Sequence, residues 1–169
     1  MLKEAVEKGG PAYIRIRNGQ EPVVSNLKEY SRMSNYNNPV TLNDNHESNI
    51  LIICYGATVI HSLRAARTLN EQGVPVNVLS IRILSRTSID EVAFQAKKYK
   101  HVVVVEEHYE DTGVGSILNN KVGMGASIIG IRKKVEHIGG LSDGLLARYG
   151  LDADSIIMKI KDMSQKEDF

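Results

Sequence analysis

The sequence predicts an α/β fold in which helices cover both faces of a parallel sheet. Two stretches carry this prediction, Asn49–Ile81 and His101–Leu118. Each begins with a β-rich apolar run, passes through a glycine-containing turn and continues with apolar residues at helical spacing. Such alternation is typical of βαβ units, whose right-handed crossovers place helices on both sides of the sheet. The length of 169 residues suits one domain with a substantial core.

Four strands are predicted in the main domain, at Ile50–Cys54, Val74–Ile81, Val102–Val105 and Ser127–Ile131. Glycines and capping residues mark the predicted ends of the helices between these strands. Gly56 precedes the first helix and Gly73 ends it. The second helix is predicted to begin at Ser88, whose spacing to Glu91 fits a capping box. A third is expected within Thr112–Val122, and a last one after Asp152 as its cap.

The apolar spacing also predicts which helix faces are buried. In the first helix the predicted inner face is Val59, Ile60, Leu63, Ala66 and Leu69, with His61, Arg64 and Glu71 elsewhere. In the second it is Ile89, Val92, Ala93, Ala96 and Tyr99, and in the last Ile156, Ile157, Ile160 and Met163.

The residues before the main domain differ in character. Residues 1–10 resemble the end of a helix stopped by Gly9-Gly10-Pro11, and Ala12–Arg17 alternates as a strand would. Residues 25–48 are rich in asparagine, although Pro39–Leu42 could form a short edge strand. We therefore expect three parts: residues 1–24 as the tail of a truncated domain, 25–48 as a linker and 49–169 as the main α/β domain.

Composition argues against several functional classes. The chain has 21 Lys and Arg against 20 Asp and Glu, only 5% aromatic residues and no tryptophan. A nucleic-acid or anionic-membrane partner is therefore not expected. The longest apolar runs are too short to span a bilayer, and residues 1–10 lack the apolar centre of a secretion signal. Cys54 is the single cysteine, which excludes an internal disulfide and favours a reducing, cytoplasmic location.

Turns at the carboxyl ends of the strands are the first candidates for a binding site. Gly56 precedes a helix whose free N–H groups could bind an anion, and a plain packing turn is the alternative. Glu106-Glu107-His108, followed by Gly113 and Gly115, could supply an acid/base pair, metal ligands or an anion-binding turn. The alternative for the two carboxylates is structural hydrogen bonding. Because neighbouring strand residues point to opposite faces, Glu106 and Glu107 are not expected to converge.

No catalytic or metal-binding set can be assigned from these residues. The Gly-x-Gly lacks the third glycine of a dinucleotide fingerprint, and no HxxxH or CxxC pair accompanies the acidic residues. Cys54 lies inside an apolar strand and is expected to be an inert core thiol. Arg15 and Arg17 share one predicted strand face beside Asn18-Gly19, an arrangement that suits phosphate recognition; ordinary surface arginines are the alternative.

Four segments together resemble the C-terminal part of transketolase-family enzymes. Gly10–Arg17 (GPAYIRIR) resembles the stretch that closes the family's pyrimidine-binding domain, and Ile52–Val59 (IICYGATV) resembles the first strand and turn of its C-terminal domain. Val104–His108 with Gly113–Ser116 is similar to the family's VEEH…G-x-G-S segment, and Arg148–Ala153 (RYGLDA) to the residues before its last helix. The order and spacing of the four segments are more specific than any one of them.

The resemblance implies a three-layer fold with a mostly parallel five-stranded sheet, in a chain that forms a dimer. It also implies that residues 1–24 end a pyrimidine-binding domain and that the complete enzyme uses thiamine diphosphate and Mg²⁺ to transfer a two-carbon ketol unit between sugar phosphates. The cofactor ligands of the family lie in domains that this chain lacks, so the chain alone is expected to bind no cofactor and to be inactive. Arg17 matches a substrate-phosphate arginine of the family.

Departures from the family pattern leave the subfamily open. Ser88-Ile89-Asp90 stands where the family often has Pro-Leu-Asp, and Glu136–Ser142 differs from its PD-x-FG-x-SG loop. A 1-deoxyxylulose-5-phosphate synthase or the beta chain of a 2-oxoacid dehydrogenase has the same C-terminal domain. Three functional classes follow: part of an enzyme completed by the remaining domains or a separate N-terminal subunit, a module that only assembles a complex, or an independent binder of a small anion.

Overall fold

The computed structural model describes residues 5–7, 9–16, 37–132 and 142–166. These contain a five-stranded sheet in the order β1-β3-β2-β4-β5. The strands are β1 (Val40–Asn43), β2 (Ile50–Cys54), β3 (Val76–Ser80), β4 (His101–Tyr109) and β5 (Ser127–Ile131). The labelled helices are α3 (Thr58–Glu71), α4 (Arg86–Ala96), α5 (Val114–Val122), α6 (Ser142–Arg148) and α7 (Ala153–Lys166).

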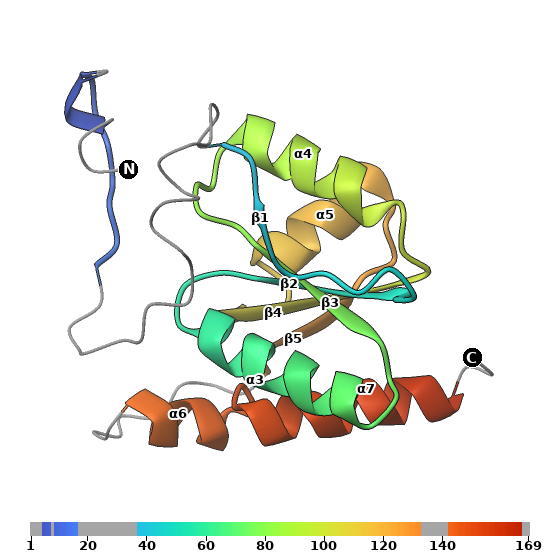
Figure 1. The fold of residues 1–169 in the computed structure, drawn as a ribbon. Coiled ribbons are helices and arrows are strands. Elements are labelled where there is room, and N and C mark those ends of the chain that lie inside the picture. Colours follow the sequence, from blue (N-terminus) through green and yellow to red (C-terminus); the bar gives the residue numbers. More distant parts are fainter. Residues whose placement is uncertain (1–4, 8, 17–36, 133–141, 167–169) are drawn as a thin grey trace.

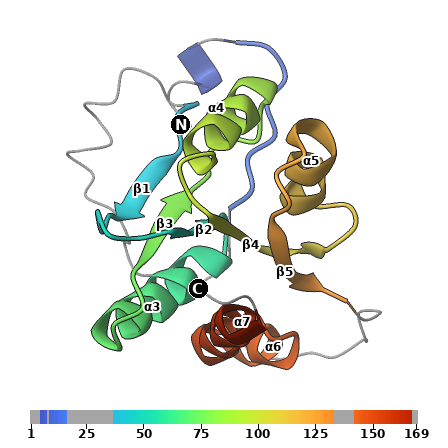
Figure 2. The ribbon, with the colours of Figure 1, turned by 90° about the vertical axis from the view of Figure 1, so that its right-hand side faces the viewer.

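The sheet forms the middle of three layers. β2 pairs in parallel with both β3 and β4, β4 pairs in parallel with β5, and β1 alone runs antiparallel, along β3. Helices α4 and α5 cover one face, while α3, α6 and α7 cover the other (Figures 1 and 2). The predicted fold class, a mostly parallel five-stranded α/β sheet with helices on both faces, is therefore confirmed.

Alternate residues of the central strands fill two separate hydrophobic cores. Ile50, Ile52 and Cys54 of β2 face the core beneath α3 and α7, whereas Leu51 and Ile53 face the core beneath α4 and α5. Every residue of β2 and β3 is buried. This explains why β2 is a continuous apolar run in the sequence instead of alternating with polar residues.

Several local predictions were wrong. Helix α4 begins at Arg86, because the Ser85 hydroxyl accepts the Ser88 N–H at 3.1 Å, so the cap lies three residues before the predicted one. Helix α6 was not predicted. His61 was placed off the inner face of its helix but is buried, with 4% of its surface exposed.

The segment before the main domain also differs from expectation. The strand predicted at Ala12–Arg17 is not formed over its described residues 12–16. Tyr13 is 91% exposed and Ile16 is 80% exposed. We call residues 9–16 the N-terminal arm; in Figure 1 it runs beside the α/β body. Arg17 lies outside the described residues.

Asn45, one of the asparagines that suggested a linker, instead ties the loop after β1 to the sheet. The buried Asn77 of β3 accepts the Asn45 N–H at 2.6 Å and lies within hydrogen-bonding distance of the Asn45 carbonyl and the Tyr99 hydroxyl. Asn70 of α3 exchanges two hydrogen bonds with the backbone of Val76. The sheet thus extends into the range 25–48 predicted as a linker, where the possible edge strand is confirmed as β1.

Among the described helices, none is both long and apolar enough to cross a membrane.

Candidate functional site

The carboxyl ends of β2 and β4 form the topological switch point of the sheet. From β2 the chain passes through α3 to β3 on one side, and then through α4 to β4 on the other side of β2. Crevices at such reversals are the usual ligand sites of open α/β sheets. Tyr55 and Gly56 follow β2 here, and Glu106, Glu107 and His108 end β4 beside them. The structure therefore brings together two of the turns that the sequence singled out.

Glu106 is a fully buried acidic side chain, with 0% of its surface exposed. Its Oε2 accepts the Tyr55 hydroxyl and the Val114 N–H, each at 2.7 Å, and its Oε1 accepts the Gly115 N–H at 3.3 Å. The two amides belong to the first turn of α5, where the helix dipole also favours a negative charge. Glu106 thus acts as an internal cap that joins β2, β4 and α5.

The Gly-x-Gly motif is explained by this carboxylate. A Cβ built on Gly113 would lie 2.3 Å from the Glu106 carboxyl atoms, and one on Gly115 would lie 2.7 Å from the Ile128 side chain. Both positions need glycine because the backbone approaches its neighbours closely. An anion-binding role was predicted for this turn, but the Val114 and Gly115 amides already donate to Glu106, which occupies the position that an external anion would take.

Tyr55 belongs to the first candidate turn, but the sequence did not reveal its role. Its hydroxyl reaches Glu106, and its ring stacks on His108 with centroids 5.9 Å apart. Burial, together with the hydrogen bond to Glu106 and the charge of that carboxylate, raises the pKa of Tyr55 well above its ordinary value, so the phenol stays protonated and donates. The sequence signal available was a tyrosine directly after an apolar strand, which many core residues share.

Glu107 points away from Glu106, as strand alternation required. Its Oε2 accepts a hydrogen bond from Nη2 of Arg15 at 3.3 Å, so the N-terminal arm reaches the switch point. Gly56, at φ +64°, lies beside the same carboxylate. The structure thus places Arg15 and Gly56 at one site with Glu107.

Comparison with known proteins identifies the family. Residues 41–156 match the family model described as "Transketolase, C-terminal domain". The chain belongs to this family. The transketolase resemblance drawn from the sequence is therefore confirmed.

Individual relatives of this transketolase C-terminal domain are distant in sequence. It is 26% identical to a "Putative transketolase C-terminal section" of Methanocaldococcus jannaschii, matching 99% of this chain and 52% of that protein. It is also 26% identical to one of the subunits of an apulose-4-phosphate transketolase from Actinobacillus succinogenes, matching 93% of this chain and 50% of that protein. The chain spans about half the length of these two curated relatives.

A solved structure shares the fold. A protein described as "Split gene transketolase, inactive beta4 tetramer" superposes with a TM-score of 0.80 at 22% identity, over 95% of this chain and 52% of that one.

Thiamine diphosphate and its metal ion require metal ligands and donors for the diphosphate group. The described residues of this transketolase C-terminal domain contain no group of three or more His, Cys, Asp or Glu side chains placed to bind a metal. At the switch point, the α5 amides that could hold a diphosphate are bonded to Glu106. The residues described do not fit this cofactor.

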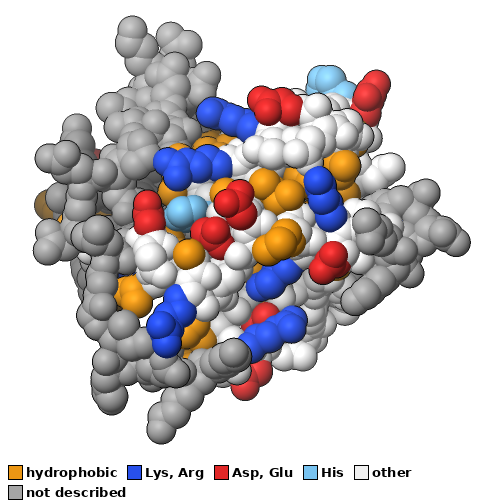
Figure 3. Space-filling view, turned by 90° about the horizontal axis from the view of Figure 1, so that it is seen from below, with side chains coloured by type: hydrophobic (Ala, Val, Ile, Leu, Met, Phe, Trp, Pro, Cys, Tyr) orange, Lys and Arg blue, Asp and Glu red, His pale blue; other side chains and the backbone are white. Residues whose placement is uncertain are grey.

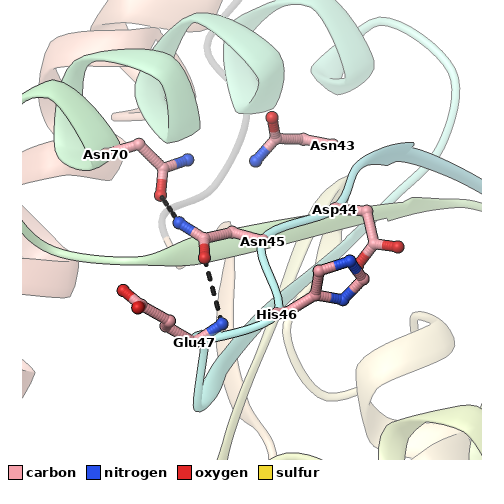
Figure 4. Close-up of a pocket in the computed structure, with 6 residues that line it drawn as sticks. All are labelled: Asn43, Asp44, Asn45, His46, Glu47 and Asn70. Carbon is pink, nitrogen blue, oxygen red and sulfur yellow. Dashed lines mark hydrogen bonds between the residues drawn. The ribbon is translucent and has the colours of Figure 1, made fainter.

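One hollow and one surface away from the switch point have ordinary explanations. A shallow pocket of about 480 Å³ between the β1–β2 loop and α3 is lined by Asn43, Asp44, Asn45, His46, Glu47 and Asn70 (Figure 4). Here Asn45 bonds both Asn70 and the Glu47 amide, so the lining is part of the network that fixes β1. On the face formed by α3, α6 and α7, charges of both signs intermix over the described residues (Figure 3).

Burial raises the pKa of Cys54 to about 12, as suits a core thiol.

Proposed function

We propose that this chain is the C-terminal section of a thiamine-diphosphate-dependent transketolase-like enzyme, which transfers two-carbon ketol units between sugar phosphates. The section works only together with the pyrimidine- and diphosphate-binding domains, supplied by the rest of a longer chain or by a separate subunit. The observation that carries the proposal is the match of residues 41–156 to the transketolase C-terminal domain, in a chain that spans about half the length of two curated relatives. Because Glu106 takes up the α5 amides at the switch point, we place the cofactor chemistry in the other domains.

Assembly is the first contribution that we propose for the section. Tyr13 and Ile16 of the N-terminal arm expose most of their surface, and the arm forms no strand over its described residues. Apolar side chains exposed on an extended segment suit packing against another domain. The arm would join the missing half, and the complete enzyme would form a homodimer. One protein with the same fold is described as an inactive beta4 tetramer, which supports the proposal that this section takes part in self-association.

Phosphate binding is the second proposed contribution. Arg15 lies at the switch point, and Arg17 follows two residues later in the sequence. Guanidinium groups bind phosphate oxygens through paired hydrogen bonds, so the two arginines would hold the phosphate of the sugar substrate once the arm is assembled. Gly56 is a further candidate for an anion contact, because the adjacent α3 has no side-chain cap and no acidic residue in its first turn.

A second candidate is the C-terminal domain of a 1-deoxyxylulose-5-phosphate synthase. One relative of that name, from Desulfotalea psychrophila, is 28% identical over 99% of this chain and 27% of its own length. A 2-oxoacid dehydrogenase beta chain has narrower support, since the beta chain of a pyruvate dehydrogenase from Staphylococcus aureus matches only 41% of this chain, at 35% identity. In both candidates this section would supply assembly and phosphate contacts, and the other domains would bind the cofactor.

The isolated chain should bind no thiamine diphosphate. Isothermal titration calorimetry with the cofactor, in the presence and absence of Mg²⁺, tests this directly. We expect no saturable heat, because the described residues include no cluster of metal ligands and the α5 amides at the switch point already donate to Glu106. Metal-dependent binding at micromolar concentration would contradict the proposal, since the section would then carry its own cofactor site.

A further inference from the structure

The pair formed by Arg15 and Glu107 joins two parts of the chain that are 92 residues apart. Glu107 lies near the end of β4 in the main domain, whereas Arg15 belongs to the N-terminal arm. The carboxylate that meets the arm therefore lies at the switch point, next to the Tyr55–His108 stack. An arginine suited to bind an anionic ligand is held here by an acidic group of its own chain.

The geometry of this pair is that of an exchangeable contact. A single hydrogen bond of 3.3 Å joins Nη2 to Oε2, and the side chain of Arg15 remains 51% exposed while that of Glu107 is 22% exposed. Exposed ion pairs of this kind are weak. A phosphate group carries more charge and can accept two parallel hydrogen bonds from one guanidinium, so it can displace such a partner.

By contrast, an acidic side chain just beyond the end of the same strand is held more firmly. Glu110 accepts from Nε of Arg132 with both carboxylate oxygens at 2.8 Å, and its Oε1 also accepts the Gly130 N–H. Glu107 makes no such backbone contact among the hydrogen bonds described. The difference marks Glu107 as the acidic side chain whose arginine can be released.

We propose that Glu107 competes with the anionic group of the substrate for Arg15. Without ligand, Glu107 holds the guanidinium at the switch point and positions the arm on the domain. A phosphate-bearing ligand takes the guanidinium over and frees the carboxylate. The inference rests on the proposed role of Arg15 in phosphate binding and adds the residue that regulates it.

The test is a titration of the full chain with inorganic phosphate at constant ionic strength, followed by NMR at the Arg15 Nε–H signal. The Glu107→Gln variant should lower the phosphate dissociation constant at this signal by about two- to fivefold, the range expected when an exposed competing ion pair is removed. The double variant with Arg15→Gln lacks this signal, so its phosphate titration is followed at the backbone amide of His108, next to residue 107, and there it should lose that gain. Glu107 is partly exposed and accepts no backbone bond in the described set, so the substitution should leave the fold intact.

The matched control is Asp90→Asn, which removes the carboxylate of another exposed ion pair, with Lys121, and changes the net charge equally. It should leave phosphate binding at the Arg15 signal unchanged. Equal dissociation constants for the wild type and Glu107→Gln would overturn the inference, as would an equal gain in Asp90→Asn.

Failure of this inference can be distinguished from failure of the proposed function. The proposed function is measured by activity with the missing domains, whereas the competition is measured on this chain alone. If the chain gains activity with those domains but Glu107→Gln binds phosphate as the wild type does, only the competition is refuted. If the predicted gain appears but no partner restores activity, only the proposed function is refuted.

Discussion

Replacing Glu106 with alanine is expected to lower the free energy of unfolding by about 3 to 5 kcal/mol. The substitution removes the common acceptor of the Tyr55 hydroxyl and of two α5 amides, and it leaves three donors and a cavity inside the protein. A buried donor without a partner costs about 1 to 3 kcal/mol, and the three share one site, so their losses do not simply add. Urea unfolding at pH 7, followed by far-UV circular dichroism, measures the change.

Two neighbouring variants make this prediction specific. Glu106→Gln keeps the volume and one acceptor oxygen but lacks the charge that the α5 N-terminus favours, so it should lose an intermediate amount of stability. Glu107→Gln makes the same chemical change one residue later, where the carboxylate is partly exposed, and should cost less than about 1 kcal/mol. A loss in Glu106→Ala no larger than that in Glu107→Gln would show that Glu106 does not hold α5 in place.

Gly113→Ala is expected to destabilise the protein by about 2 to 3 kcal/mol. The added Cβ would overlap the Glu106 carboxyl group, with its nearest atoms at 2.3 Å. Gly113 has φ −85°, a value open to any residue, so the cost comes from the overlap and not from backbone strain. Either α5 or the carboxylate must move, and the hydrogen bonds to Val114 and Gly115 then lengthen. The same urea unfolding experiment measures the loss.

The matched control is Gly144→Ala, the same substitution inside α6. A Cβ at Gly144 meets no atom within 4 Å. Alanine there should stabilise the protein by about 0.5 to 1 kcal/mol through its higher helix propensity. If Gly113→Ala were as well tolerated as Gly144→Ala, the close fit between the glycine and Glu106 would be refuted.

Most strands of the sheet could be predicted from sequence because they are short apolar runs bounded by turn signals. Ile50–Cys54 and Ser127–Ile131 have the predicted bounds, since a short apolar run between turn signals has few other structures available. β4 is longer than predicted, because its last residues are polar and the apolar pattern stops at Val105. The start of α4 was misplaced because two serines three residues apart both suit a cap, and only the fold selects Ser85.

The candidate site was only partly predictable. Strand alternation correctly separated Glu106 from Glu107, but no local pattern shows that one carboxylate is buried against a helix start while the other meets the arm. The contact between Tyr55 and Glu106 spans 51 residues and depends on the pairing of β2 with β4. The asparagines near β1 suggested a linker because their composition is that of a loop, whereas Asn77 and the Val76 carbonyl give Asn45 and Asn43 partners that only the folded sheet supplies.

The central claim is that this chain supplies structure to an enzyme whose cofactor chemistry lies in another section. The most direct test purifies the chain and the matching N-terminal section from the same genome, separately and as a mixture. Ketol transfer between sugar phosphates is then assayed with thiamine diphosphate and Mg²⁺, and complex formation is followed by analytical ultracentrifugation. We predict that each section alone is inactive and that the mixture forms one complex with transketolase activity. Ketol transfer by this chain alone, or an N-terminal section that is fully active without it, would contradict the claim.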